Sequence, residues 1–125
     1  MQHRLHIDGL LFNVLDEGVG EPVLLVHGFP DDHTVWRHQV SALVSAGYRV
    51  IAPDYPGYGQ SEAPDHQAFP YTFEKFGEVV DGLLHRLGVD RFAMYVMDYG
   101  APIGFRLAAK HPERIQALIV QNGNA

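Results

Sequence analysis

The 125-residue sequence contains no cysteine. This absence excludes a disulfide framework, a thiolate metal site and a cysteine nucleophile. Basic residues are also scarce: nine lysines and arginines stand against fifteen aspartates and glutamates, which gives a net charge of -6. The few basic residues are scattered along the chain and form no patch of the kind that contacts nucleic acid. We therefore expect no nucleic-acid partner.

Long hydrophobic runs are missing as well. No stretch is long enough to cross a bilayer, and the first ten residues, MQHRLHIDGL, lack the apolar core of a signal peptide. We therefore expect no membrane partner and a cytoplasmic location. The composition is that of an ordinary globular protein, with 46% hydrophobic and 19% charged residues. We expect a single domain over residues 1–125, with a modest core.

Strand-like and helix-like segments alternate along the chain. Residues 3–16 predict a β-hairpin that turns at Asp8-Gly9. Apolar runs predict buried strands at 22–28, 48–53, 92–97 and 115–120. Helical spacing of apolar residues predicts helices at 32–46, 72–87 and 102–111. Crossovers of this kind build a parallel sheet with helices on both faces. The prediction is an α/β fold with a mostly parallel sheet and an initial antiparallel hairpin.

Three polar or glycine-rich segments follow strands directly, at 27–30, 54–61 and 98–100. Sites in such sheets form at the carboxyl ends of the strands. Asp98 stands there between an apolar strand and a helix, where aspartate is a favoured N-cap. However, Ala101 occupies the position of the usual capping-box partner, and Gly100 suits the close strand–helix contact of a nucleophile elbow. Local sequence alone leaves both roles open.

Three motifs together resemble those of the α/β-hydrolases. They are HGFP at 27–30, DYPGYGQSEAP at 54–64 and VMDYGAPIGFRLAAKHPERI at 96–115. Within that superfamily they are similar to members with an aspartate nucleophile, the epoxide hydrolases and haloalkane dehalogenases. The resemblance extends over essentially the whole chain. It implies the N-terminal half of an α/β-hydrolase fold.

The resemblance also implies a role for individual residues. Asp98 would be the nucleophile, kept ionised by the N-terminus of the following helix, and would form an alkyl ester that water later cleaves. The backbone N–H groups of Phe29 and Tyr99 would form the oxyanion hole.

Four further residues would shape the loops around this site, namely His27, Gly28, Pro30 and Gly100. The resemblance also implies a cis bond before Pro30. Ser61 would stabilise its own loop. Neither a metal nor a cofactor is expected.

The substrate is implied only as a class. In haloalkane dehalogenases a tryptophan normally follows the nucleophile and an asparagine often follows the HG pair, whereas Tyr99 and Phe29 occupy these positions here. HGFP is closest to epoxide hydrolases. The sequence therefore favours epoxide hydrolysis, with haloalkane dehalogenation or another α/β-hydrolase reaction as the alternative. The expected partner is a small organic epoxide, halide or ester.

The catalytic set is expected to be incomplete. In α/β-hydrolases the acid and the histidine follow the nucleophile in sequence. The only histidine after Asp98 is His111, and thirteen helical residues place it roughly 20 Å away. We therefore expect a truncated hydrolase that lacks the cap, the acid and the catalytic histidine, or else a non-catalytic fragment. The apolar strand at 115–120 would then be an unprotected sheet edge, which predicts self-association.

Overall fold

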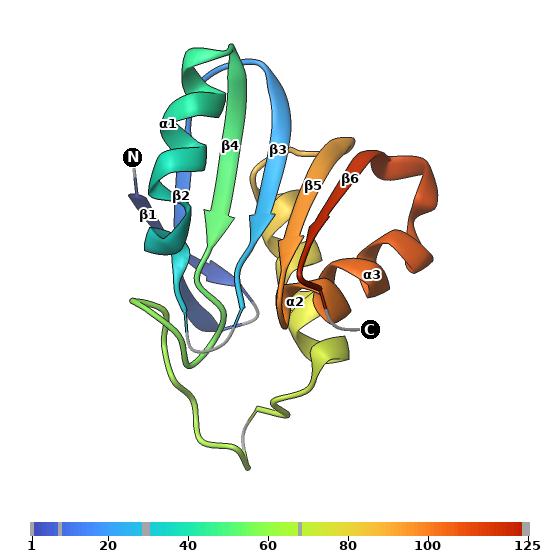
Figure 1. Ribbon diagram of the computed structural model, residues 1–125. Helices are drawn as coiled ribbons and strands as arrows, with labels where there is room; N and C mark the ends of the chain where they lie inside the picture. Colours follow the sequence, from blue (N-terminus) through green and yellow to red (C-terminus); the bar gives the residue numbers. More distant parts are fainter. Residues whose placement is uncertain (1, 8, 29–30, 68, 124–125) are drawn as a thin grey trace.

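The computed structural model describes residues 2–7, 9–28, 31–67 and 69–123 (Figure 1). Its strands are β1 (Gln2–Ile7), β2 (Leu10–Glu17), β3 (Glu21–Val26), β4 (Tyr48–Pro53), β5 (Phe92–Met97) and β6 (Ile115–Gln121). Its α-helices are α1 (Arg37–Ser45), α2 (Phe73–Arg86) and α3 (Gly100–Lys110), and two 3-10 turns, η1 (His33–Trp36) and η2 (Pro112–Arg114), precede α1 and β6. The predicted α/β class is confirmed.

The six strands form one sheet in the order β1-β2-β4-β3-β5-β6. β1 pairs with β2 and β2 pairs with β4 in antiparallel fashion, whereas β4, β3, β5 and β6 are parallel. The initial hairpin and the mostly parallel sheet are thus as predicted. Val26 at the end of β3 pairs with Val96 near the end of β5. The segments that follow these two strands therefore leave the sheet side by side.

Helices cover both faces of the sheet (Figure 1). α1 packs on one face over a cluster that includes Leu25, Trp36 and Val50. α2 and α3 pack on the other face over a larger core that includes Leu24 and Met94. Neighbouring side chains of β3 thus enter different cores, which explains its continuous apolar run. No helix among the residues that the structure describes combines the length and apolarity needed to span a membrane.

Side-chain caps explain where two helical segments begin. The Asp32 carboxylate accepts the Thr34 N–H at 2.9 Å at the start of η1. The Thr72 hydroxyl accepts the Lys75 N–H at 3.0 Å at the start of α2. Each bond satisfies a backbone donor that the helix itself leaves unpaired. The segment predicted as one helix at 32–46 differs from expectation, because its first turn is the 3-10 turn η1.

β6 forms one edge of the sheet, as the sequence predicted. Its apolar side chains are about half exposed: 43% for Leu118, 50% for Ile119 and 49% for Val120. Successive strand residues point to opposite faces, so both faces of this edge are apolar and open. Among the residues that the structure describes, no strand pairs with the outer edge of β6, so this edge combines unpaired backbone groups with hydrophobic surface.

Candidate active site

Asp98 lies at the sharp turn between β5 and α3. Its φ of 53° is in the left-handed region, which is uncommon for a residue that carries a side chain. The Ala101 N–H donates to the Asp98 carbonyl at 3.1 Å, so the chain turns into the helix at once. Tyr99 holds the N-cap position of α3, which places Asp98 one residue outside it. A strained residue at a strand end is the backbone geometry of a nucleophile elbow.

Gly100 permits this turn because α3 touches the backbone of β3. A Cβ on Gly100 would lie 2.1 Å from the Val26 carbonyl oxygen and 2.8 Å from that of His27. One helical turn later, a Cβ on Gly104 would lie 2.5 Å from Cγ1 of Val96. These distances are far below van der Waals contact. The two glycines therefore allow the start of α3 to lie directly on the strands.

Gly28 brings the segment after β3 against Asp98. A Cβ on Gly28 would lie 2.6 Å from the Asp98 Cβ and 2.8 Å from its Oδ2, so only glycine leaves this space free. Phe29 and Pro30 come next and lie outside the described residues. The Phe29 N–H donor, the loop-shaping role of Pro30 and the cis bond before it therefore stay predictions. Tyr99, the other expected donor, directly follows Asp98, and its side chain is 44% exposed.

His27 is fully buried beside this turn. Its ring stacks on the Tyr55 ring with the centroids 4.1 Å apart. It forms a T-shaped contact with the Tyr58 ring, with the centroids 5.6 Å apart. Nδ1 lies 2.8 Å from the Gly28 carbonyl oxygen, and since a carbonyl only accepts, Nδ1 carries the proton. Burial lowers the pKa of His27, and the hydrogen bond to Gly28 opposes this effect only in part. The ring is therefore held neutral in an aromatic environment.

The lowered pKa of His27 predicts a pH-dependent stability. The unfolded-state pKa is near 6.5 and the folded-state pKa is lower, so below pH 6.5 the unfolded chain binds more protons and stability is lost as the pH falls. We expect the Tm to drop between about pH 7.5 and about pH 5.5, and to drop less in a His27→Gln variant. Circular dichroism melts at several pH values measure both slopes. Equal slopes in parent and variant would contradict a neutral, buried His27.

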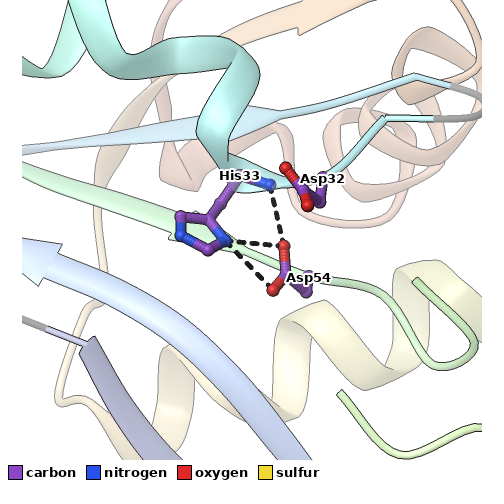
Figure 2. A group of neighbouring side chains, drawn as sticks. All are labelled: Asp32, His33 and Asp54. Atoms are coloured by element: carbon purple, nitrogen blue, oxygen red, sulfur yellow. Dashed lines mark hydrogen bonds and ion pairs between the residues drawn. The ribbon is translucent and has the colours of Figure 1, made fainter. Parts of the chain in front are cut away.

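A second carboxylate, Asp54, lies at the carboxyl end of β4 and is fully buried. Figure 2 shows it facing His33: Oδ1 accepts the His33 N–H at 2.7 Å, and His33 Nδ1 lies 2.9 Å from Oδ1 and 3.0 Å from Oδ2. Oδ2 also accepts from Asn13 Nδ2 at 2.9 Å and from the Gln60 N–H at 3.1 Å. The carboxylate is therefore surrounded by hydrogen-bond donors.

The same region contains three possible metal ligands. Asp32, His33 and Asp54 each offer one ligand atom, and these atoms lie within 4.8 Å of one another. The donors already around Asp54 occupy the lone pairs that a metal would need, and Asp32 caps η1. We therefore assign this group a hydrogen-bonding role and not a metal-binding one.

The motifs did not single out Asp54 or His33 as partners. The only signal in the sequence was position: Asp54 directly follows β4, just as Asp98 directly follows β5, and the carboxyl ends of these parallel strands lie on the same side of the sheet. No spacing rule indicated that His33 in η1 would turn its ring toward it. Ser61 does stabilise its own loop, because its hydroxyl donates to the Asp54 carbonyl at 2.7 Å and accepts the Asn13 N–H at 2.9 Å.

His111 lies far from this group of residues. It is the C-cap residue of α3, at the opposite end of the helix from Asp98. Its Nε2 is 3.8 Å from Oδ2 of Asp81 on α2. The histidine that follows Asp98 in sequence is thus part of the contact between two helices.

The strand order and the elbow at Asp98 define the class of protein: both are features of α/β-hydrolases. A family model described as alpha/beta hydrolase fold matches residues 21–125. The chain therefore belongs to the α/β-hydrolase family.

Individual relatives cover nearly all of this chain. An uncharacterised hydrolase of Saccharomyces cerevisiae is 40% identical over 98% of the chain and 42% of its own length. A haloalkane dehalogenase of Psychrobacter cryohalolentis is 36% identical over 96% of the chain and 42% of its own length. The crystal structure of an epoxide hydrolase from Vigna radiata matches with a TM-score of 0.90 and 37% identity, over 96% of this chain and 39% of that one. The chain thus spans about two fifths of the length of these relatives.

Proposed function

We propose that Asp98 is the nucleophile of an epoxide hydrolase-type reaction. The observation that carries the proposal is the left-handed backbone of Asp98 at the strand–helix turn, with Gly28 beside its carboxylate. A carboxylate oxygen attacks one carbon of the epoxide, and the bond from that carbon to the ring oxygen breaks. The released alkoxide takes a proton from water, which leaves a hydroxyalkyl ester on Asp98.

The residues around Asp98 favour an epoxide over a haloalkane. Tyr99 follows the nucleophile and provides no indole N–H for a departing halide, and the HGFP segment resembles that of epoxide hydrolases. A haloalkane is the second candidate, because a haloalkane dehalogenase is 36% identical to this chain. Halide release on incubation with a bromoalkane, at a rate above that with an epoxide, would favour the second candidate.

Cleavage of the ester is a separate step. It develops an oxyanion, for which we propose the N–H groups of Tyr99 and Phe29 as donors, and it needs a base that activates water. Of the histidines near or after Asp98 in the described chain, His27 is enclosed by aromatic rings and His111 lies at the far end of α3. We therefore infer that the 125-residue chain forms the ester but does not turn over.

Incubation with a reactive aryl epoxide tests this function. Intact-protein mass spectrometry should show one adduct per chain, and diol formation should stop at about one equivalent or less. Sustained turnover by this chain would contradict the proposed lack of a base. The absence of any adduct would contradict the proposed nucleophile.

We further propose that the β6 edge mediates self-association. Ile119 and Val120 are about half exposed on opposite faces of the strand at the end of the sheet. The outer edge of such a strand pairs readily with another strand. The occupant we propose is a second copy, with two β6 strands antiparallel across a two-fold axis. This proposal concerns the isolated chain and does not depend on its chemistry.

An Ile119→Lys substitution is expected to shift the chain toward the monomer. A lysine places a charge on the edge face and disfavours strand pairing. Val19 provides the matched control, because it is 91% exposed but lies in the turn between β2 and β3. Light scattering over a concentration series should show a dimer for the parent and for Val19→Lys. A parent that stays monomeric at the highest concentration would overturn the proposal.

A further inference from the structure

We propose that Asp54 and Tyr55 are positioning residues that hold both ends of the turn after β3 against Asp98. Neither residue is expected to touch the substrate. The consequence for catalysis rests on the proposed function, because it concerns the oxyanion donor that follows Gly28. The positioning itself can be tested without any substrate.

Tyr55 holds the first end of the turn. Its hydroxyl donates to the His27 carbonyl at 2.6 Å, and its ring stacks on the His27 ring at an interplanar angle of 26°. The Tyr55 ring also stacks on Phe76 of α2, with the centroids 5.5 Å apart. Burial raises the pKa of Tyr55 well above its ordinary value, with smaller contributions from Tyr58 and Asp54. The hydroxyl therefore keeps its proton and remains a donor.

Asp54 holds the second end of the turn. Its carboxylate accepts both the backbone N–H and the ring Nδ1–H of His33, which is the first residue of η1 (Figure 2). The side chain of Asn13 on β2 and the backbone of Gln60 also donate to this carboxylate. Asp54 thus connects the turn to β2 and to its own loop. Because the group is fully buried, water does not compete for these bonds.

The described residues on either side of positions 29 and 30 are also bonded to each other. The Asp31 N–H donates to the Gly28 carbonyl at 2.9 Å, and His27 Nδ1 donates to the same oxygen at 2.8 Å. Both anchors are consecutive residues that leave β4, so they move as one unit. Gly28 in turn abuts the Asp98 side chain. A change at either anchor therefore alters the position of the turn relative to the nucleophile.

This arrangement predicts different effects on the two chemical steps. Attack by Asp98 on an epoxide carbon develops no charge on the carboxyl oxygen and needs no oxyanion donor. Cleavage of the ester does develop that charge, and donors must be placed to within a few tenths of an ångström to stabilise it. Weakening an anchor should therefore slow ester cleavage and leave ester formation unchanged.

The test uses Tyr55→Phe, which removes the hydroxyl and keeps the stacked ring. Tyr71→Phe is the matched control, since the Tyr71 hydroxyl also donates to a backbone carbonyl, that of Pro64, outside the turn. The first measurement is amide hydrogen exchange by NMR. In Tyr55→Phe the Asp31 N–H should exchange about tenfold faster than in the parent, while amides of β5 keep their rates. Unchanged exchange at Asp31, or faster exchange throughout the chain, would overturn the positioning role.

The second measurement follows the ester on each protein. The chain is first alkylated with a reactive epoxide, and hydroxylamine is then added as an external nucleophile in place of the missing base. Tyr55→Phe should be alkylated at the parental rate but release the ester about tenfold more slowly, and Tyr71→Phe should match the parent in both steps. Equal slowing of both steps would show a general structural defect and overturn the link to catalysis. If the parent forms no ester, the proposed function fails, while hydrogen exchange still decides the positioning.

Discussion

An Asp98→Ala variant is expected to form no epoxide adduct, whereas the parent chain forms one adduct per molecule. The substitution removes the carboxylate that we propose as the nucleophile, and the chain has no cysteine that could react with an epoxide in its place. Asp98→Asn should fail as well, because an amide of nearly the same shape is a poor nucleophile. This pair of variants separates the chemical role of the side chain from its volume.

The control for this prediction is an exposed carboxylate elsewhere in the chain. The Asp65 side chain is 68% exposed on the loop before α2. If exposure alone made a carboxylate reactive, Asp65 would react with the epoxide as well. Asp65→Asn should keep the parental adduct yield, measured by intact-protein mass spectrometry. An adduct of equal yield on Asp98→Ala would show that the reaction does not involve Asp98.

The second large effect is expected from Gly100→Ala, which should destabilise the chain by about 3 kcal/mol or more. The added Cβ would lie 2.1 Å from the Val26 carbonyl oxygen, and β3 cannot move aside because β4 and β5 flank it. A loss of this size is a large fraction of the stability of a small domain, about 5–15 kcal/mol. The variant should therefore unfold at a markedly lower urea concentration than the parent.

Gly77→Ala provides the comparison for Gly100→Ala. Gly77 lies inside α2, where the nearest atom to an added Cβ is the Ile103 carbonyl oxygen at 3.7 Å, an ordinary contact. Alanine there should stabilise the helix by about 0.5–1 kcal/mol. Urea unfolding monitored by circular dichroism measures both variants. Equal stability of the two would mean that α3 does not press on β3 as described.

Much of the fold follows from local patterns in the sequence. The helical stripe from Phe76 to Leu87 and the cap at Thr72 predicted α2, and the apolar runs predicted β4 and β5 at their observed bounds. The 3-10 turn η1 was not predicted, because helical periodicity does not distinguish it from the first turn of an α-helix. Phe29 and Pro30 lie outside the described residues, and both oxyanion-hole donors, Phe29 and Tyr99, stay predictions.

The two carboxylates at the carboxyl ends of β4 and β5 show what local sequence cannot decide. Asp54 and Asp98 both follow an apolar strand directly. Donors from β2, from η1 and from its own loop surround Asp54. Asp98 instead adopts a left-handed backbone beside Gly28. These differences depend on contacts between residues far apart in the chain. The resemblance to α/β-hydrolases pointed to Asp98, but only the three-dimensional arrangement shows that Asp54 binds His33 and that Tyr55 binds His27.

Locating the adduct in the sequence tests the central claim most directly. The parent chain is treated with about one equivalent of a reactive aryl epoxide and digested at low pH to preserve the ester. Fragment ions are then used to assign the added mass to one residue. We predict that the mass of the intact epoxide lies on Asp98 and on no other carboxylate. An adduct on a histidine, or spread over several exposed acidic residues, would contradict Asp98 as the nucleophile.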